Sequence, residues 1–134
     1  MPTWMLVEDD PDIRNIVSMM FKLWGKTPLV FSHGGAAWAW LDTVATGSFS
    51  GEMPELVLMD IRMPIKTGDQ VAARIREVDK VAKLPIVLMT AFALNDGEVA
   101  TLKQRSGADQ VIFKPLPDIA KFHTMLADLL TKKT

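Results

Sequence analysis

Five short apolar segments, which alternate with stretches of helical periodicity, constrain the fold of this chain more than any other feature. They are residues 4–7, 27–31, 56–59, 86–89 and 111–113. Apolar runs of this length, bounded by Pro and Gly, are typical of strands that are buried on both faces. Strands that alternate with helices predict an α/β fold: a doubly wound, five-stranded parallel sheet with helices on both faces and right-handed crossovers.

The stretches between these segments carry apolar residues three and four positions apart, as helices with one buried face do. In the first helix the predicted buried residues are Ile13, Ile16, Val17, Met20, Leu23 and Trp24. In the second helix they are Ala37, Trp38, Leu41, Val44 and Ala45. Trp40 falls at the edge of that stripe, where a large aromatic residue is typically part of the core. Asn95 or Asp96 is predicted to cap the fourth helix, which has the thinnest apolar stripe of the five.

Length and composition exclude several classes of protein. The 134 residues fit one ordinary domain with a full-sized core, so we expect a single domain over residues 1–134. The formal net charge of −1 provides no basic field for nucleic acid or an anionic membrane. No apolar run approaches the ~20 residues that span a bilayer. The absence of cysteine excludes disulfides, thiolate zinc sites and cysteine nucleophiles, and it is consistent with a cytoplasmic location.

Four of the five predicted strands end in a polar or charged residue that could take part in chemistry. Glu8 and Asp9 follow the first strand, Asp60 the third, Thr90 the fourth and Lys114 the fifth. Each residue alone has an ordinary explanation, since Asp, for example, is common where a strand gives way to a turn. In a parallel sheet, however, the carboxyl ends of the strands share one edge, and ligands bind there. We therefore expect these residues to converge at one site.

The residue types at this edge suit phosphoryl transfer. The carboxylates of Glu8, Asp9 and Asp60 are hard oxygen ligands, which suit Mg²⁺ or a similar divalent cation such as Mn²⁺. Lys114 offers a compact positive charge to a phosphate oxygen, and Thr90 offers a hydroxyl donor. A carboxylate can itself be the nucleophile and form an aspartyl phosphate. Asp60, at the end of the central strand, is best placed for that role.

Four motifs that carry these residues occur in order along the chain: Glu8-Asp9, Asp60-x-x-Met63-Pro64-x-x-x-Gly68, Thr90-Ala91 and Lys114-Pro115. Each motif is weak alone, but as a set they make the chain resemble the receiver domain of two-component response regulators. The resemblance implies a flavodoxin-like, CheY-like (βα)5 fold with strand order 2-1-3-4-5.

The resemblance also implies roles for individual residues. Asp60 would be the phosphoacceptor and a ligand of Mg²⁺. Asp9 would bind the ion directly, Glu8 would act mostly through a water molecule, and Arg62 would offer its backbone carbonyl. The catalytic set would be Asp60 together with Thr90 and Lys114, which would bind the phosphoryl oxygens. The Lys114–Pro115 peptide bond would be cis, as X-Pro bonds allow.

A receiver domain is a phosphoacceptor signalling domain and not an enzyme with an external substrate. A histidine kinase or phosphotransfer protein would supply the phosphoryl group. The new charge would draw Thr90 inward and change how the face formed by the fourth helix, fifth strand and fifth helix binds a downstream protein. No direct contact with nucleic acid or membrane is implied. The cognate kinase, the downstream output and homodimerisation stay open, and so does whether the domain stands alone or belongs to a longer regulator or hybrid kinase.

One position departs from the family pattern, and other readings of the chain have to be weighed. Receivers commonly carry Tyr or Phe three residues before the lysine, where this chain has Val111. A phosphate-independent pseudo-receiver that acts as an interaction module is the main alternative, although such modules often lack part of the motif set. An aspartyl phosphatase would need a second Asp at position 62, where Arg62 cannot act as acid or base. A flavin mononucleotide carrier would need a phosphate loop after the first strand, where the acids would repel it.

Overall fold

Parallel pairing of all five strands builds the sheet that the sequence predicts. The structure is a computed structural model that describes residues 1–133. The strands are β1 Thr3–Val7, β2 Thr27–Phe31, β3 Leu56–Asp60, β4 Ile86–Thr90 and β5 Gln110–Phe113. Their order in the sheet is β2-β1-β3-β4-β5, which confirms the predicted doubly wound topology. All four pairs of neighbouring strands are parallel, so the carboxyl ends lie at one edge of the sheet.

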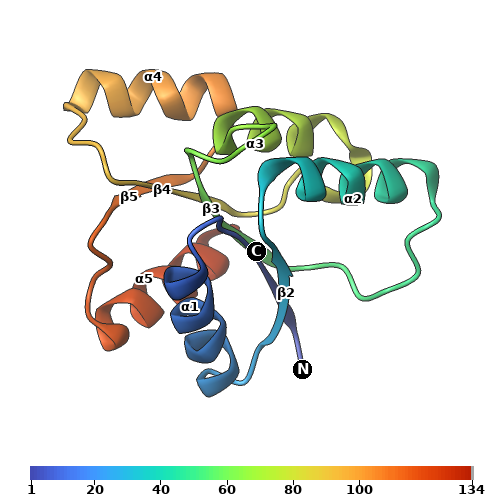
Figure 1. Ribbon diagram of the computed structural model, residues 1–134, viewed down its shortest axis with the longest axis horizontal. Helices are drawn as coiled ribbons and strands as arrows, with labels where there is room; N and C mark the ends of the chain where they lie inside the picture. The colour runs from blue at the N-terminus through green and yellow to red at the C-terminus, as the bar shows by residue number, and fades with distance from the viewer. Residues whose placement is uncertain (134) are drawn as a thin grey trace.

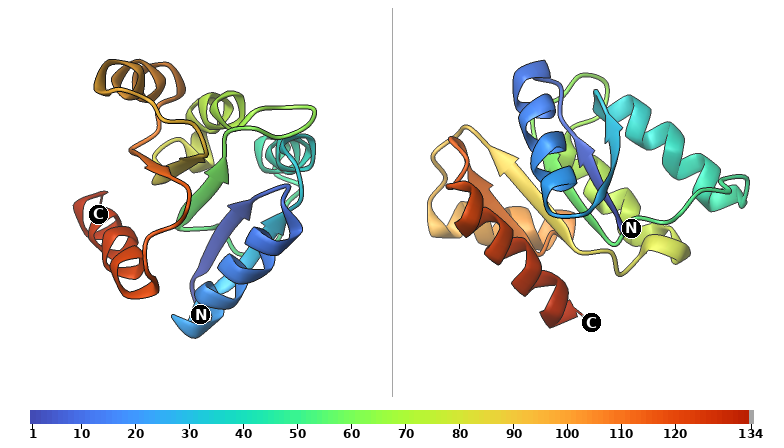
Figure 2. Two further views of the ribbon diagram at one scale, coloured as in Figure 1. Left: turned by 60° about the vertical axis from the view of Figure 1, so that its left-hand side comes forward. Right: turned by 90° about the horizontal axis from the view of Figure 1, so that it is seen from below.

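Helices cover both faces of this sheet (Figures 1 and 2). They are α1 Pro11–Leu23, α2 Gly34–Thr46, α3 Gly68–Glu77, α4 Asp96–Ser106 and α5 Ile119–Lys133, and the short 3₁₀ helix η1 Asp79–Val81 follows α3. Figure 1 shows α2, α3 and α4 on one side of the sheet and α1 and α5 on the other. Within the described part of the chain, no helix is both long and apolar enough to cross a membrane.

Side chains alternate between two apolar clusters along the central strands, because successive residues of a strand point to opposite faces. On β3, Val57 and Met59 pack toward α2, α3 and α4. Leu56 and Leu58 pack toward α1 and α5. The central strands are thus buried on both faces, as their uninterrupted apolar sequence predicts.

The buried face of α1 differs from the predicted one. Phe21, which the predicted stripe omits, is fully buried, and its ring meets the ring of Trp4 edge-on at a centroid distance of 5.3 Å. Ile16 and Leu23, which the stripe includes, are 51% and 73% exposed. The buried stripe centres on Val17 and Phe21, which are four residues apart on the helix. Ile16 and Leu23 lie outside this stripe.

Most of the predicted buried face of α2 is confirmed, since Ala37, Leu41 and Val44 are buried and Trp40 is part of the core. Trp40 is 6% exposed and belongs to the core with Leu41, whereas the predicted Ala45 is exposed. Trp38, also predicted to be buried, is only half-buried. Its ring lies under two cations, with Lys66 Nζ 4.3 Å and Arg74 Cζ 4.6 Å from the ring centroid. Trp38 therefore ties α2 to α3 and to the loop that precedes it.

Gly34 allows that loop to approach α2 closely. A Cβ atom at Gly34 would overlap the backbone carbonyl of Lys66, so a glycine is required at this contact. The loop carries Ile65 in the left-handed region, at φ 74°. The segment that follows Asp60 is thus packed firmly against the start of α2.

The helix α4 has the thin contact with the core that its sequence predicts. Leu102 and Ser106 are its buried residues. Asn95 caps its first turn, with the side-chain oxygen accepting a hydrogen bond from Glu98 N at 2.8 Å. Leu102 is the one buried apolar residue of α4, so we expect local stability to be low in this helix.

Candidate functional site

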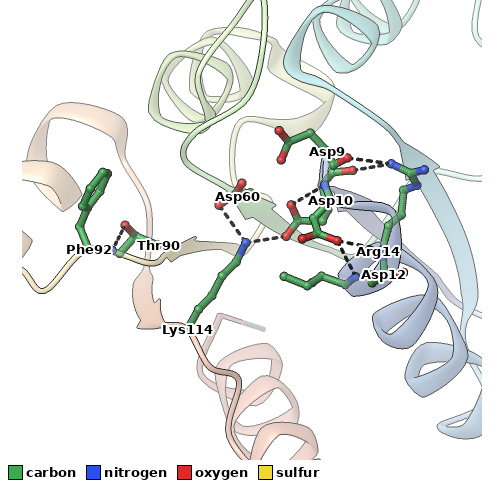
Figure 3. Close-up of polar contacts among 10 residues, drawn as sticks. Asp9, Asp10, Asp12, Arg14, Asp60, Thr90, Phe92 and Lys114 are labelled. Carbon is green, nitrogen blue, oxygen red and sulfur yellow. Dashed lines mark hydrogen bonds and ion pairs between the residues drawn. The ribbon is translucent and has the colours of Figure 1, made fainter.

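Three carboxylates meet at the carboxyl edge of the sheet. Glu8 and Asp9 follow β1, and Asp60 ends β3, which pairs with β1 in parallel. Ligand oxygens of the three residues lie within 4.8 Å of one another. Glu8 is fully buried, Asp60 is 6% exposed and Asp9 is exposed. The predicted acidic pocket is therefore present, with two buried acids and one that faces solvent (Figure 3).

Lys114 reaches into this pocket from the end of β5. Its Nζ lies 2.9 Å from Glu8 Oε1, to which it donates a hydrogen bond, and 3.4 Å from Asp60 Oδ1. The backbone N–H of Lys114 donates to the carbonyl of Thr90 at 2.8 Å, which aligns the ends of β4 and β5. The Lys114–Pro115 peptide bond is cis, as the family resemblance implied. One ammonium thus serves two buried carboxylates, and it leaves the pocket with an excess of negative charge.

The loop between β1 and α1 is held in place by two further residues. Asp10 caps α1: its Oδ1 accepts hydrogen bonds from Asp12 N at 2.9 Å and Ile13 N at 3.2 Å. Arg14 donates from one guanidinium nitrogen to the carbonyls of Glu8 at 3.1 Å and Asp9 at 3.4 Å. The sequence does not single out Arg14, and its position one turn into the helix after the acids is the only signal.

Burial and crowding of charge change the ionisation of Asp60. Burial, followed by repulsion from Glu8, raises the pKa of Asp60 to about 7, although Lys114 acts in the opposite direction. Burial by itself would lower the pKa of Lys114, but the hydrogen bond to Glu8 and the charge of Asp60 outweigh it and raise that pKa. Lys114 therefore stays charged, while Asp60 is protonated more readily than an ordinary aspartate.

The side chains of Thr90 and Arg62 contact Phe92. Thr90 is 2% exposed, and its hydroxyl accepts a hydrogen bond from Phe92 N at 3.0 Å. Figure 3 shows this hydroxyl beside the backbone of Phe92 and separate from the carboxylates. The guanidinium carbon of Arg62 lies 4.6 Å from the centroid of the Phe92 ring. The structure brings Glu8, Asp9, Asp60 and Lys114 together, whereas the Thr90 hydroxyl bonds Phe92 N and the Arg62 side chain lies on the Phe92 ring.

The donor set fits a hard divalent cation. Three carboxylates whose oxygens can approach within 4.8 Å match the oxygen ligands that Mg²⁺ prefers. Because only Lys114 opposes their charge within the described pocket, a dication would also relieve the repulsion that raises the pKa of Asp60. The residues present are thus suited to hold such an ion.

A family model and the sequences of known proteins assign this chain to the same family. The model of the response regulator receiver domain matches residues 5–127. An uncharacterized 14.6 kDa protein of Leptolyngbya boryana is 30% identical over 112 residues, which cover 84% of this chain and 78% of that protein. Regulatory protein AtoC of Escherichia coli is 31% identical over 111 residues, which cover 83% of this chain and 22% of AtoC. This chain therefore corresponds to only part of AtoC.

The fold is also found in solved structures. The receiver domain of a sensor histidine kinase from Pseudomonas aeruginosa, crystallised with a magnesium ion coordinated in its active site cleft, has a TM-score of 0.77 to this chain. The two are 20% identical, and the match covers 98% of this chain and 99% of the other. At this identity the likeness establishes the fold.

Proposed function

Because this chain belongs to the response regulator receiver domain family, we propose that it accepts a phosphoryl group on Asp60 in a Mg²⁺-dependent reaction and thereby changes its binding to a partner protein. The observation that carries the proposal is the position of Asp60. Its carboxylate lies between two other acids and the ammonium of Lys114, at the end of the central strand. This arrangement combines a nucleophile, a cation site and a phosphate-binding cation.

The proposed reaction transfers the phosphoryl group from a phosphohistidine nitrogen to Asp60. A carboxylate oxygen of Asp60 attacks phosphorus, the phosphorus–nitrogen bond breaks, and the nitrogen keeps the electron pair and takes up a proton. Lys114 is already within 3.4 Å of Asp60 Oδ1, so a small movement brings its ammonium to a phosphoryl oxygen. The hydroxyl of Thr90 donates a hydrogen bond to another phosphoryl oxygen. These two contacts stabilise the charge that the transfer brings into the pocket.

Mg²⁺ would be held by Asp9, Asp60 and the backbone carbonyl of Arg62, with Glu8 acting through a water molecule. When bound, the ion neutralises charge on the phosphoryl oxygens during transfer. The other residues act without it: Arg14 keeps the loop of Glu8 and Asp9 in position through their carbonyls. Mn²⁺ has the same ligand preference and would replace Mg²⁺.

The proposed donor is a histidine kinase or phosphotransfer protein in the cytoplasm. A downstream protein would bind the face formed by α4, β5 and α5, whose helix α4 has the thinnest contact with the core. A pseudo-receiver that needs no phosphate is not supported, because Asp9, Asp60, Thr90 and Lys114 are all present.

Intact mass spectrometry tests the proposal directly. The protein is incubated with acetyl phosphate or phosphoramidate, with Mg²⁺ or with EDTA. We expect a gain of one phosphoryl group that requires Mg²⁺, is lost in alkaline hydroxylamine and is absent from Asp60→Asn. Asp12→Asn, which changes an exposed acid on α1, is the matched control and should accept the group normally. No gain in folded protein that binds Mg²⁺ would refute the proposal.

A further inference from the structure

A cavity of about 600 Å³ lies beside Thr90, between the loop that follows β4 and the helix α4. Its apolar lining includes Ile61, Leu94 and Leu102, and the ring of Phe92 borders it. The volume is ample for a phenyl ring. The helix α4, whose buried residues are Leu102 and Ser106, thus forms one wall of a space that an aromatic side chain can enter.

Phe92 occupies an exposed position at the edge of this cavity. Its side chain is 48% exposed although the apolar residues Ile61, Leu94 and Leu102 line the cavity beside it. The contact that holds the ring outside is the cation–π interaction with Arg62, whose guanidinium carbon is 4.6 Å from the ring centroid. Turning the ring inward would remove apolar surface from water. The structure places the ring outside, on Arg62, and the cavity offers an alternative position inside, against Leu102.

Thr90 connects this ring to the acidic pocket. Its hydroxyl oxygen accepts a hydrogen bond from Phe92 N at 3.0 Å, while its hydrogen remains available for donation. When the hydroxyl donates to a phosphoryl oxygen on Asp60, it can keep the bond from Phe92 N. Since the Thr90 side chain must move toward Asp60 to do so, the backbone of Phe92 is drawn along with it.

We propose that phosphorylation of Asp60 pulls Phe92 off Arg62 and into the cavity beside α4, so that Phe92 is the aromatic switch of this domain. The inference rests on the proposed function, because it needs a phosphoryl group on Asp60. Phe92 would then supply, from the loop after β4, the aromatic side chain that Val111 does not supply from β5. Entry of the ring against Leu102 moves the wall formed by α4, and the partner-binding face changes with it.

Fluorine NMR of protein labelled with 4-fluorophenylalanine tests the proposal. The chain has six phenylalanines, and Phe92→Leu and Phe49→Leu identify two of the resonances. Phe49 is the internal control, since it is partly exposed, packs against Trp40 and does not line the cavity beside α4. Solvent exposure of each ring is measured as line broadening by a soluble nitroxide, with and without Mg²⁺ and beryllofluoride, which mimics a phosphoryl group on a carboxylate.

On loading with beryllofluoride, we expect nitroxide broadening of Phe92 to fall at least threefold and that of Phe49 to stay unchanged. Thr90→Val keeps the shape of the side chain but removes the hydroxyl, so Phe92 should stay exposed in this variant although beryllofluoride is bound. Thr90→Ser should restore the protection.

Two results would overturn the inference while leaving the proposed function intact. The first is an equally exposed Phe92 in wild-type protein that shows the resonance of bound beryllofluoride. The second is full protection of Phe92 in loaded Thr90→Val. If neither bound beryllofluoride nor a gain of phosphoryl mass is detected in folded protein, the proposed function itself fails, and the inference fails with it.

Discussion

Asp60 is held in an environment that opposes its own charge. Burial and the neighbouring Glu8 raise its pKa, and Lys114 offsets this only in part. In the proposed reaction Asp60 has to be ionised to act as a nucleophile, and a cation bound beside it would favour that form. The buried, crowded carboxylates of the acidic pocket therefore lower the stability of the fold, as functional sites commonly do.

Replacing Asp60 should stabilise the fold in a pH-dependent way. The pKa of Asp60 is about 7 in the folded state and near 4 in the unfolded chain, so the folded state binds more protons between these values. Stability of the wild type therefore falls as pH rises from about 4 to 7. Without Mg²⁺, a shift of about three pKa units corresponds to at most about 4 kcal/mol, so Asp60→Asn should gain on the order of 3 kcal/mol at pH 7.5 and about 1 kcal/mol at pH 4.5.

Urea unfolding in EDTA at both pH values measures this gain. Asp128→Asn, at an exposed position of α5, is the control and should show no such pH dependence. Saturating Mg²⁺ should shrink the difference at pH 7.5, because a bound cation stabilises the ionised form of Asp60. A gain that is equal at both pH values would contradict the electrostatic explanation.

Removing Lys114 should reveal the cost of the buried Glu8 charge. Lys114→Met leaves that carboxylate, which is fully buried, without its cation. The expected loss of stability is about 3 kcal/mol. Adding Glu8→Gln should recover most of it, which a double-mutant cycle measures. Lys26→Met, which breaks the more exposed pair with Glu55, should cost less than about 1 kcal/mol, and an equal cost would argue against the role of burial.

The helix α1 shows how far a sequence pattern can place an element and where it stops. The existence of α1 and its Asp10 cap could be predicted, because capping chemistry and periodicity are local. Its buried face could be predicted only in part: Val17 is buried and Ile13, Met20 and Trp24 pack against the core as predicted, whereas Phe21 was missed. Which residues turn inward depends on the partner surface, here the ring of Trp4 against Phe21.

Mutations of Phe21 and Leu23 should separate the buried face of α1 from the exposed one. Phe21→Ala should lower the free energy of unfolding by about 3–5 kcal/mol, because it removes a fully buried ring. Leu23→Ala, at a side chain that is 73% exposed, should change it by less than about 0.5 kcal/mol. Chemical denaturation compares the two. Similar losses would mean that Leu23 is buried in the core as the sequence pattern predicts.

Across the whole molecule, the parallel topology explains why the site was predictable at a distance. Glu8, Asp60 and Lys114 were expected to meet because parallel strands share one edge, and they do. The contacts of Arg14 with two carbonyls and of Arg62 with Phe92 could not be predicted. They depend on side-chain rotamers and loop paths, which spacing along the chain does not determine.

Mg²⁺ should stabilise the whole domain through the acidic pocket. A ligand that binds only the folded state adds about 2.7 kcal/mol at a concentration one hundred times its Kd. We expect Mg²⁺ to raise the Tm of the wild type, and Asp9→Asn to lose most of this rise. Asp12→Asn should keep it. Thermal scans against Mg²⁺ concentration provide the test, and an equal rise in both variants would place the ion elsewhere.

Lys114 completes the pocket from a position 106 residues beyond its partner Glu8. During synthesis on a ribosome, the acids therefore emerge long before the lysine that joins them. A growing or prematurely terminated chain that lacks β5 has no means to close the site. The two buried acids thus stay without their cation until β5 has been made and has paired with β4.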